Sequence, residues 1–388
     1  MSNDASIATT FPGFEELCRT ELEELGLPIH SVSRGAVAFG GGTAGLYTAT
    51  LWSRTALRVL RPVASFHARD AGELYTKGHR VPWERWFRPD TTFAVDATTS
   101  SSIFTHSHYA ALKVKDALVD RLREHLGARP NVDVERPAMR VRVHVRETLV
   151  NLSLDAAGDS LHRRGYRLEH GEAPLNETVA AALLRIAGYG GQLPLVDPFC
   201  GAGTIPIEAA LAATNVAPGL LREHHALECW SDHEPALWES LRKSAQSQQR
   251  PASHLIVGAD TDPALIESAQ RNAERAGVAN ALRLVVSDFR ELEPPQGPGL
   301  VVTNPPYGVR LAATDLAALY TGFGDRLKCA YDRYDAWLLS GAPALLKRVG
   351  LRAGKRIPVL NGNLDCRFVR FTIRGKGARP PSACIPSN

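Results

Sequence analysis

Apolar residues in the first 65 positions fall into alternating helical and strand-like patterns. Phe14, Leu17 and Leu22 are spaced to share one face of a helix, and Gly26 is a typical helix stop. A run of three glycines at 40–42 can cradle phosphate, but no P-loop sequence follows it, so we expect a turn there. The pattern predicts a helix at 14–25, a strand at 36–39, a helix at 44–53 and a strand at 58–63. A small α+β unit is therefore predicted over residues 1–65.

A second unit is predicted over residues 66–160, in the order strand, helix, strand, strand. The pattern gives a strand at 92–97, an amphipathic helix at 109–126, and a hairpin formed by residues 139–145 and 148–154. Gly127 ends the helix. Arg140 and Arg142 lie on the polar face of the hairpin. They are equally suited to contact phosphate or to keep an exposed edge strand soluble.

Helices alternate with short apolar strands from residue 175 onward, after a connector at 161–174. This alternation is typical of an α/β domain with a mostly parallel sheet. Asn176 is placed to cap the first helix of this part. Four strands are expected, each ending just before a polar side chain: Asp197, Asp260, Asp288 and Asn304.

The composition sets broad limits on the class of protein. The chain has 388 residues, is 44% hydrophobic and carries a net charge of +4. It has no run of eighteen apolar residues and no basic-then-apolar signal at its start, so we expect no membrane span and no secretion. Its six cysteines are scattered without a Cys-x-x-Cys pair, which favours a reducing cytoplasm over a zinc site or a disulfide frame. From Lys328 onward the sequence contains twelve basic and three acidic residues. This excess of positive charge suits either a polyanionic partner or a solvated surface.

The candidate cofactor site begins with a strand, a Gly-x-Gly turn at Gly201 and Gly203, and a helix. Glycines let the backbone approach a ligand closely. The third glycine of a dinucleotide fingerprint is replaced by Pro206, and Asp197 precedes the turn where a pyrophosphate would be repelled. A dehydrogenase is therefore the weakest alternative. A carboxylate at this position suits a cationic group, such as the amino group of S-adenosylmethionine.

The next two strand ends supply further groups suited to that cofactor. Asp260 stands where an acidic residue can bind both ribose hydroxyls. Asp288 can accept the adenine amino group, and Phe289 can cover the adenine ring. Four strand ends with suitable groups in serial order are more specific than any one of them.

The fourth strand ends in a stiff turn, Asn304-Pro305-Pro306-Tyr307. Each proline fixes its own φ and restricts the residue before it. The Asn304 carboxamide and a backbone carbonyl can each accept one N–H of an exocyclic amine, which aims the nitrogen lone pair outward. Tyr307 can stack on the base, and such stacking contributes roughly 1–3 kcal/mol. By itself the turn fits either attack by an amino group of a flat base or an ordinary turn at a strand end. The three strand ends upstream favour the first interpretation.

These motifs resemble those of class I methyltransferases that act on exocyclic amines. Together with residues 161–167, 173–178, 215–219 and 360–367, they resemble the bacterial guanine-N2 RNA methyltransferases that carry an N-terminal THUMP domain, most of all those of 23S ribosomal RNA. The resemblance covers nearly the whole chain. It implies a ferredoxin-like domain at 1–65, a THUMP RNA-binding domain at 66–160, a linker at 161–174 and a Rossmann-like, doubly wound methyltransferase domain at 175–388.

The resemblance also implies roles for individual residues. The target base must leave its stack to reach the pocket, and no strong general base is evident, so the proton is expected to leave after methyl transfer. The expected catalytic residues are Asn304, Pro305, Pro306 and Tyr307. The expected cofactor-binding residues are Asn176, Thr178, Asp197, Phe199, Cys200, Gly201, Gly203, Thr204, Asp260, Thr261, Asp288, Phe289 and Asn304. The expected RNA-binding residues are Arg140, Arg142, Arg163 and Arg164.

Several alternatives remain open at this point. The tRNA-directed relatives share most of these motifs, and the same turn serves DNA amino-methyltransferases and protein-glutamine methyltransferases. A non-catalytic RNA-binding factor in ribosome assembly is a further alternative. The segment at 213–254 contains His224, His225 and Cys229, but their spacing fits no zinc pattern, so we expect a helical insertion without a metal. The oligomeric state is not predicted.

Overall fold

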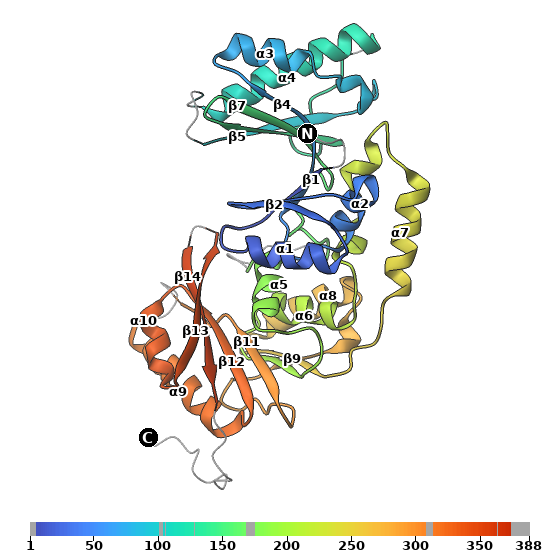
Figure 1. Ribbon diagram of the computed structural model, residues 1–388. Coiled ribbons are helices and arrows are strands. Elements are labelled where there is room, and N and C mark those ends of the chain that lie inside the picture. The colour runs from blue at the N-terminus through green and yellow to red at the C-terminus, as the bar shows by residue number, and fades with distance from the viewer. Residues whose placement is uncertain are drawn as a thin grey trace. The chain divides into compact units, whose positions relative to one another are not determined.

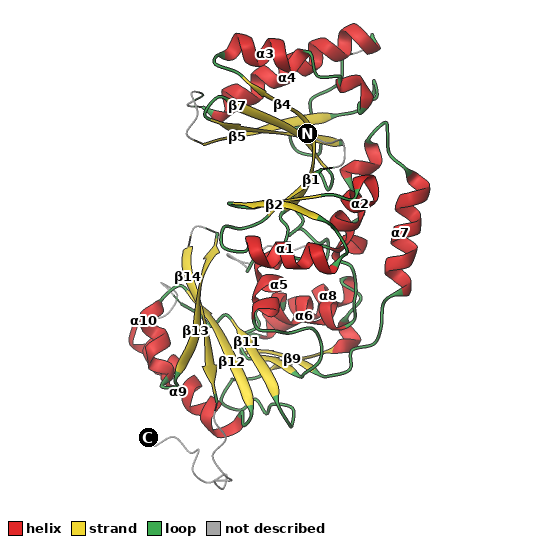
Figure 2. Cartoon of the chain, viewed as in Figure 1, coloured by secondary structure: helices red, strands yellow, loops and turns green. Residues whose placement is uncertain are grey.

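The computed structural model describes residues 5–100, 104, 106–127, 129–167, 175–307, 313–362 and 364–373. The chain divides into two compact units. One unit contains residues 1–11, 18–161 and 222–244, and the other contains 12–17, 162–221 and 245–388. Figures 1 and 2 show the elements of both. Part of the connector expected at 161–174 and the basic residues from Arg374 onward lie outside the described residues.

A seven-stranded sheet forms the centre of the first unit, with strand order β2-β3-β1-β4-β7-β6-β5. Its strands are β1 (Ser6–Thr9), β2 (Ile29–Ser33), β3 (Ala36–Phe39), β4 (Arg58–His67), β5 (Phe93–Ser100), β6 (Met139–Arg146) and β7 (Leu149–Asp155). The helices in this part of the sequence are α1 (Glu15–Glu24), α2 (Gly42–Trp52), α3 (Ala71–His79) and α4 (Ser107–Leu126), with a short 3-10 turn, η1 (Trp83–Arg85). The predicted hairpin and the helix that ends at Gly127 are confirmed.

Strand β4 continues through residue 65, where the sequence predicted the end of the first unit. Residues 58–60 pair with β1, and residues 60–67 pair with β7. The register shifts between Pro62 and Ala64, because a proline cannot donate to the ladder. The two predicted N-terminal units therefore share one continuous sheet.

The second unit is built on a sheet with strand order β10-β9-β8-β11-β12-β14-β13. Its strands are β8 (Leu195–Asp197), β9 (Ile256–Asp260), β10 (Leu282–Val286), β11 (Gly299–Thr303), β12 (Tyr334–Ser340), β13 (Ala353–Asn361) and β14 (Leu364–Thr372). Only β14 runs antiparallel to its neighbours on both sides. The order reverses between β8 and β11, which makes the carboxyl ends of these two strands a topological switch point.

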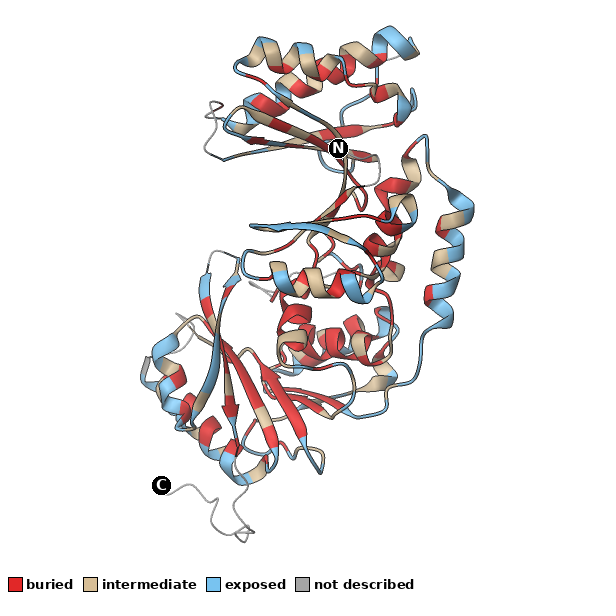
Figure 3. Cartoon of the chain, in the orientation of Figure 1, coloured by how far each residue is buried: buried red, intermediate tan, exposed pale blue. Residues whose placement is uncertain are grey.

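Helices cover both faces of this second sheet (Figure 1). They are α5 (Glu177–Ile186), α6 (Thr204–Ala213), α8 (Pro263–Arg275), α9 (Ala313–Ala330) and α10 (Pro343–Leu346), with the 3-10 turns η2 (Pro218–Leu221), η4 (Ala279–Ala281) and η5 (Lys347–Val349). Buried residues follow the central strands, and every residue of β8 and β11 is buried (Figure 3). The predicted fold class, a doubly wound α/β sheet preceded by α+β structure, is confirmed.

The predicted insertion is helical, as expected, and its middle part belongs to the first unit. It contains η3 (Ala226–Cys229) and α7 (Pro235–Ser247). Backbone N–H groups of Leu227 and Ser231 donate to the carbonyls of Ala156 and Trp86, at 2.9 Å each. Residues 222–244 are therefore a built-in part of the first unit, although they lie between two elements of the second in sequence.

Candidate active site and cofactor site

Four predicted site residues follow four adjacent parallel strands. In the order β10-β9-β8-β11, the strands pair in parallel throughout, so their carboxyl ends meet at one edge of the sheet. Asp197 and Asp260 end β8 and β9, while Asp288 and Asn304 follow β10 and β11. The structure therefore brings together the four groups on which the sequence prediction depended.

The Gly-x-Gly turn between β8 and α6 adopts the backbone that only glycine reaches without strain. Gly201 has φ +54° and Gly203 has φ +86°. A Cβ at Gly203 would stand 2.9 Å from the Cβ of Ala269, whereas a Cβ at Gly201 would meet nothing within 4 Å. Gly201 therefore borders open space, into which a ligand can approach the backbone. Its N–H donates to Asp260 Oδ2 at 3.0 Å, which ties the turn to the end of β9.

Asp197 is almost completely buried at the end of β8, with 1% of its surface exposed. Its Oδ1 accepts hydrogen bonds from the Thr303 hydroxyl (2.6 Å) and the Phe199 N–H (3.2 Å). Burial raises the pKa of Asp197 to about 7, against the lowering effect of these two donors. Among the described residues, Oδ2 has no hydrogen-bond partner. Burial and the neighbouring Asp197 and Asp260 also raise the pKa of the Cys200 thiol, so Cys200 stays protonated.

The aromatic residues near the third strand end form a packed cluster. Phe199, Phe289 and Phe323 have ring centroids 5.2 to 5.6 Å apart. Phe289 is only 2% exposed, and the Arg290 guanidinium lies 4.7 Å from its ring centre. Asp288 accepts from Arg290 Nη1 at 2.9 Å and from its N–H at 2.8 Å. The roles expected for Asp288 and Phe289 toward adenine stay predictions, and Arg290 is a neighbour that the sequence did not reveal.

Asn304 carries the most informative polar atom of the site. Its Oδ1 is buried and has no hydrogen-bond partner among the described residues. A buried amide oxygen left without a partner costs roughly 1–3 kcal/mol, so such an atom usually serves a ligand. The preceding residue, Thr303, is completely buried and fixed to Asp197. An acceptor is thus held rigidly beside the cofactor edge of the sheet.

Tyr307 is anchored through its hydroxyl to the β13–β14 hairpin. Asn361 Nδ2 donates to the hydroxyl at 3.4 Å, and Cys366 Sγ lies 3.7 Å away. Burial raises the pKa of Tyr307 to about 12, opposed by side-chain hydrogen bonds from Asn361 and Asn304. A Cβ on Gly341 would come within 2.8 Å of the ring, so Gly341 makes room for it. Gly308, the last residue of the motif, lies outside the described residues.

The next expected cofactor-binding residues lie at the starts of α5 and α6. Asn176 caps the helix as predicted, because its Oδ1 accepts from the N–H groups of Thr178 (2.9 Å) and Val179 (3.3 Å). The Thr178 hydroxyl is buried and has no partner among the described residues. The Thr204 hydroxyl accepts a short hydrogen bond from Arg167. Arg167 was not among the predicted site residues, although it belongs to the basic connector that the sequence singled out.

The arginines expected to bind RNA are mostly engaged within the protein. Strand β6 is an interior strand between β7 and β5, so the edge-strand alternative is wrong. Arg140 and Arg142 both pair with Asp96, at 2.9 and 2.7 Å. Arg164 is 2% exposed and pairs with the buried Glu208 at 3.3 Å, which makes it a core residue and not part of a surface. Arg163 is exposed.

In the described ranges, no three His, Cys, Asp or Glu side chains are grouped as they would be to hold a metal ion. None of the described helices is long and apolar enough to cross a membrane. Cys18, Cys200, Cys229 and Cys366 are free thiols.

The residues present fit a methyl-donor cofactor. Gly201 borders open space, and Asp197 has an oxygen available for an ammonium group. Asn304, which directly follows the Asp197 partner Thr303, has an acceptor that is unpaired among the described residues. With the reversed strand order, these features define a class I methyltransferase, a class whose methyl donor is S-adenosylmethionine.

Comparisons with known sequences and structures agree with this class. Residues 164–370 match the family described as RMKL-like, methyltransferase domain, residues 68–155 match the THUMP domain, and residues 6–60 match the RlmL ferredoxin-like domain. The chain therefore belongs to the RMKL-like methyltransferase family, as its motifs indicated.

Individual relatives span most of this chain. The ribosomal RNA large subunit methyltransferase K/L of Syntrophotalea carbinolica is 42% identical over 97% of the chain, which corresponds to 55% of that relative's length. A putative RNA methyltransferase of Synechocystis sp. is 38% identical over 94% of the chain and 96% of its own length. The solved structure of SMU.472, a putative methyltransferase complexed with SAH, superposes with a TM-score of 0.86 at 28% identity, covering 97% of this chain and all of that one.

Proposed function

We propose that the protein transfers a methyl group from S-adenosylmethionine to the exocyclic N2 of a guanosine in large-subunit ribosomal RNA. The observation that carries this proposal is the buried, unpartnered Oδ1 of Asn304 at the cofactor edge of the sheet. The sequence similarity to a large-subunit ribosomal RNA methyltransferase and to the THUMP domain supports RNA as the substrate class. The chain spans about half the length of that relative, so the similarity concerns this half alone.

The Asn304 turn addresses the main difficulty of the reaction. The lone pair of the guanine amino group is delocalised into the ring, which makes the nitrogen a poor nucleophile. Asn304 Oδ1 and the Pro305 carbonyl each accept one of its N–H groups, so that the lone pair points away from both acceptors. The two prolines hold this pair of acceptors in place. Much of the rate then comes from alignment, which can supply several kcal/mol of the barrier.

The cofactor is held by the neighbouring strand ends. Asp197 Oδ2 receives the ammonium group, Asp260 the ribose hydroxyls and Asp288 the adenine amino group. When bound there, S-adenosylmethionine supplies an electrophilic methyl group on a sulfonium. The bare backbone at Gly201 allows this close approach.

Proton removal does not rely on Tyr307. With a pKa of about 12, its hydroxyl stays protonated near neutral pH and cannot act as a base. The amine becomes far more acidic once it is methylated, so the proton can pass to solvent afterwards. Tyr307 acts instead through its ring, which stacks on a guanine that has left its helix or is already single-stranded. The hydrogen bond from Asn361 holds the hydroxyl end of that ring in place.

The substrate points to the cytoplasm as the place of action, and we include this location in the proposal. Ribosome assembly and the pool of S-adenosylmethionine are both found there in bacteria.

The proposal is tested by methylation of three RNAs in parallel. The purified chain is incubated with labelled S-adenosylmethionine and protein-free large-subunit ribosomal RNA, assembled large subunits or total tRNA, and the product is digested to nucleosides. We expect N2-methylguanosine in the ribosomal RNA. Label in tRNA alone would assign the protein to a tRNA substrate, and labelled methyladenosine would contradict the guanine assignment.

The control separates catalysis from binding. Asn304→Ala is assayed beside the wild type, with the affinity for S-adenosylhomocysteine measured for both. If the wild type binds S-adenosylhomocysteine but labels no RNA, the catalytic proposal fails and an RNA-binding assembly factor becomes the better account.

A further inference from the structure

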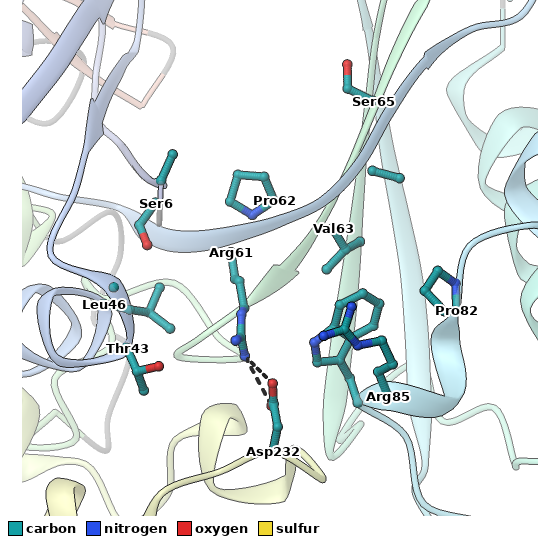
Figure 4. Close-up of a pocket in the computed structure, with 14 residues that line it drawn as sticks. Ser6, Thr43, Leu46, Arg61, Pro62, Val63, Ser65, Pro82, Arg85 and Asp232 are labelled. Carbon is teal, nitrogen blue, oxygen red and sulfur yellow. Dashed lines mark hydrogen bonds and ion pairs between the residues drawn. The ribbon is translucent and has the colours of Figure 1, made fainter. Parts of the chain in front are cut away.

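A pocket of about 270 Å³ is lined by residues of the first unit alone. Its lining comes from β1, the start of α2, the middle of β4 and the segment around η1 (Figure 4). Asp232, from the inserted segment, completes the lining. The volume is slightly below the roughly 300–1,000 Å³ of small-molecule sites, so it suits one phosphate with its sugar better than a whole cofactor.

The start of α2 contributes backbone donors to this pocket. The helix has eleven residues, and its N-cap, Gly41, makes no side-chain cap hydrogen bond. Gly42 and Thr43, the first two helical residues, line the pocket. The N–H groups of a first helical turn have no partner within the helix, and the helix dipole there favours an anion. The three-glycine run, from which the sequence predicted only a turn, thus leads directly into the pocket.

Ser6 supplies an independent indication of a ligand. It lines the pocket from β1 and is only 4% exposed. Its hydroxyl makes no hydrogen bond to any described residue. The Ser6 and Thr43 hydroxyl groups lie on the same side of the pocket (Figure 4). A hydroxyl without a partner among the described residues, on a side chain that is almost fully buried and lines the pocket, is a donor that an oxyanion would satisfy.

The charged lining residues are two arginines and one aspartate. Arg61 Nη1 contacts both oxygens of Asp232, at 2.9 and 3.1 Å, while its guanidinium lies over the Trp230 ring at 5.4 Å. Arg85 is exposed and makes no ion pair with a described residue, and its guanidinium lies 5.7 Å from the Trp86 ring centre. The lining therefore keeps one net positive charge, carried by Arg85.

We infer that this pocket binds a phosphate group of the RNA substrate. Arg85, the Ser6 and Thr43 hydroxyls and the start of α2 supply the donors, and Asp232 acts as an internal counter-ion that holds part of the charge of Arg61. The pocket offers donors from two sides, with Ser6 and Thr43 on one and Arg85 on the other (Figure 4). Arg85 and Trp86 belong to the segment that matches the THUMP domain, and Ser6 and Thr43 belong to the ferredoxin-like match. The RNA source of the phosphate rests on the proposed function.

The first test measures phosphate binding without RNA. Thermal unfolding of the full chain is followed in sodium phosphate and in sodium chloride of equal ionic strength. We expect the midpoint to rise with phosphate in the wild type, because a ligand that binds only the folded state stabilises it. The rise should be lost in Arg85→Ala and enlarged in Asp232→Asn, which releases Arg61. A gain in Asp232→Asn cannot come from misfolding.

The second test measures the dissociation constant for large-subunit ribosomal RNA against salt concentration. We expect Arg85→Ala to weaken binding about tenfold and to lower the salt slope by about one. Asp232→Asn should bind more tightly. The control is Arg34→Ala, which removes the same charge from the exposed turn between β2 and β3, outside the pocket lining. It should change affinity much less, and all variants should keep their affinity for S-adenosylhomocysteine.

Each outcome decides one part of the inference. Equal phosphate responses in the wild type, Arg85→Ala and Asp232→Asn would overturn the site. A phosphate response confined to the pocket, with RNA affinity unchanged in Arg85→Ala, would overturn the RNA source and indicate a free phosphate compound. A wild type that binds no RNA would contradict the proposed function. The unfolding measurements in phosphate would still show whether the pocket binds phosphate.

Discussion

At the residue scale, Asp197 and Asn304 each carry an oxygen that a bound ligand would supply with a partner. Asp197 is buried with a pKa raised to about 7, and Asn304 keeps a buried oxygen without a partner among the described residues. Both are fixed by Thr303, whose hydroxyl donates to Asp197 and whose backbone leads into Asn304. The sequence identified both residues, but it gave no sign of Thr303, because only the paired strands β8 and β11 bring it beside Asp197.

The raised pKa of Asp197 predicts a pH-dependent affinity for the cofactor. The ammonium group of S-adenosylhomocysteine prefers the carboxylate, which forms only as the pH rises through about 7. The affinity should therefore increase between pH 5.5 and 7, approaching about tenfold per pH unit, with release of a proton. Isothermal titration calorimetry in buffers of different ionisation enthalpy measures both quantities.

The matched variant for this prediction is Asp197→Asn. It should bind more weakly and lose the pH dependence over the same range. The folding stability of the free protein should change with pH in the opposite direction to the cofactor affinity. The folded state binds more protons than the unfolded state between about pH 3.8 and 7, so the free energy of unfolding falls as the pH rises through this window. A flat affinity profile in the wild type would contradict a contact between Asp197 and the ammonium group.

At the scale of elements, the two glycines of the turn between β8 and α6 have different roles, one in packing and the other in ligand binding. A methyl group at Gly203 meets Ala269 at 2.9 Å, whereas one at Gly201 meets only open space. Gly203→Ala should therefore reduce the free energy of unfolding by about 2–4 kcal/mol, from overpacking and a left-handed backbone. Gly201→Ala carries only the backbone cost of about 1–2 kcal/mol.

For cofactor affinity, the order of the two variants should be reversed, with Gly201→Ala affected more than Gly203→Ala. Gly201→Ala places its methyl group where the cofactor approaches, so we expect at least a tenfold loss of affinity for S-adenosylhomocysteine in a protein that still folds. Chemical denaturation and calorimetry on the two variants check the pair. Equal stability and equal affinity in both would show that the turn does not border the cofactor.

Four strands of the second sheet, β8 to β11, could be predicted from the sequence because they are short apolar runs that end in recognisable polar groups. Strands β12, β13 and β14 were not predicted from the residues. The helices α5 and α8 also carry their own caps, Asn176 and Asp262. Strands β1 and β2 were missed. The first has four residues, and the second has no buried residue, so neither shows a clear alternation. The core position of Arg164 was also missed, since its partner Glu208 is 44 residues away in sequence.

At the scale of the whole molecule, the chain does not follow the order of its predicted units. β4 joins two predicted units in one sheet, and residues 222–244 return from the methyltransferase part of the sequence to the first unit. Non-local pairings of this kind are invisible to local sequence patterns. They also assemble the phosphate pocket, whose lining comes from five separate stretches of chain.

The central claim is that Asn304 aligns the guanine amino group for methyl transfer. The most direct measurement is the single-turnover rate of N2-methylguanosine formation in the full chain, for the wild type and Asn304→Ala, at saturating cofactor and RNA. We predict a loss of about 100-fold in the variant, because alignment is lost while binding is kept. Affinities for S-adenosylhomocysteine and RNA should change by only a few fold. A variant that methylates guanine within a few fold of the wild-type rate would contradict the claim.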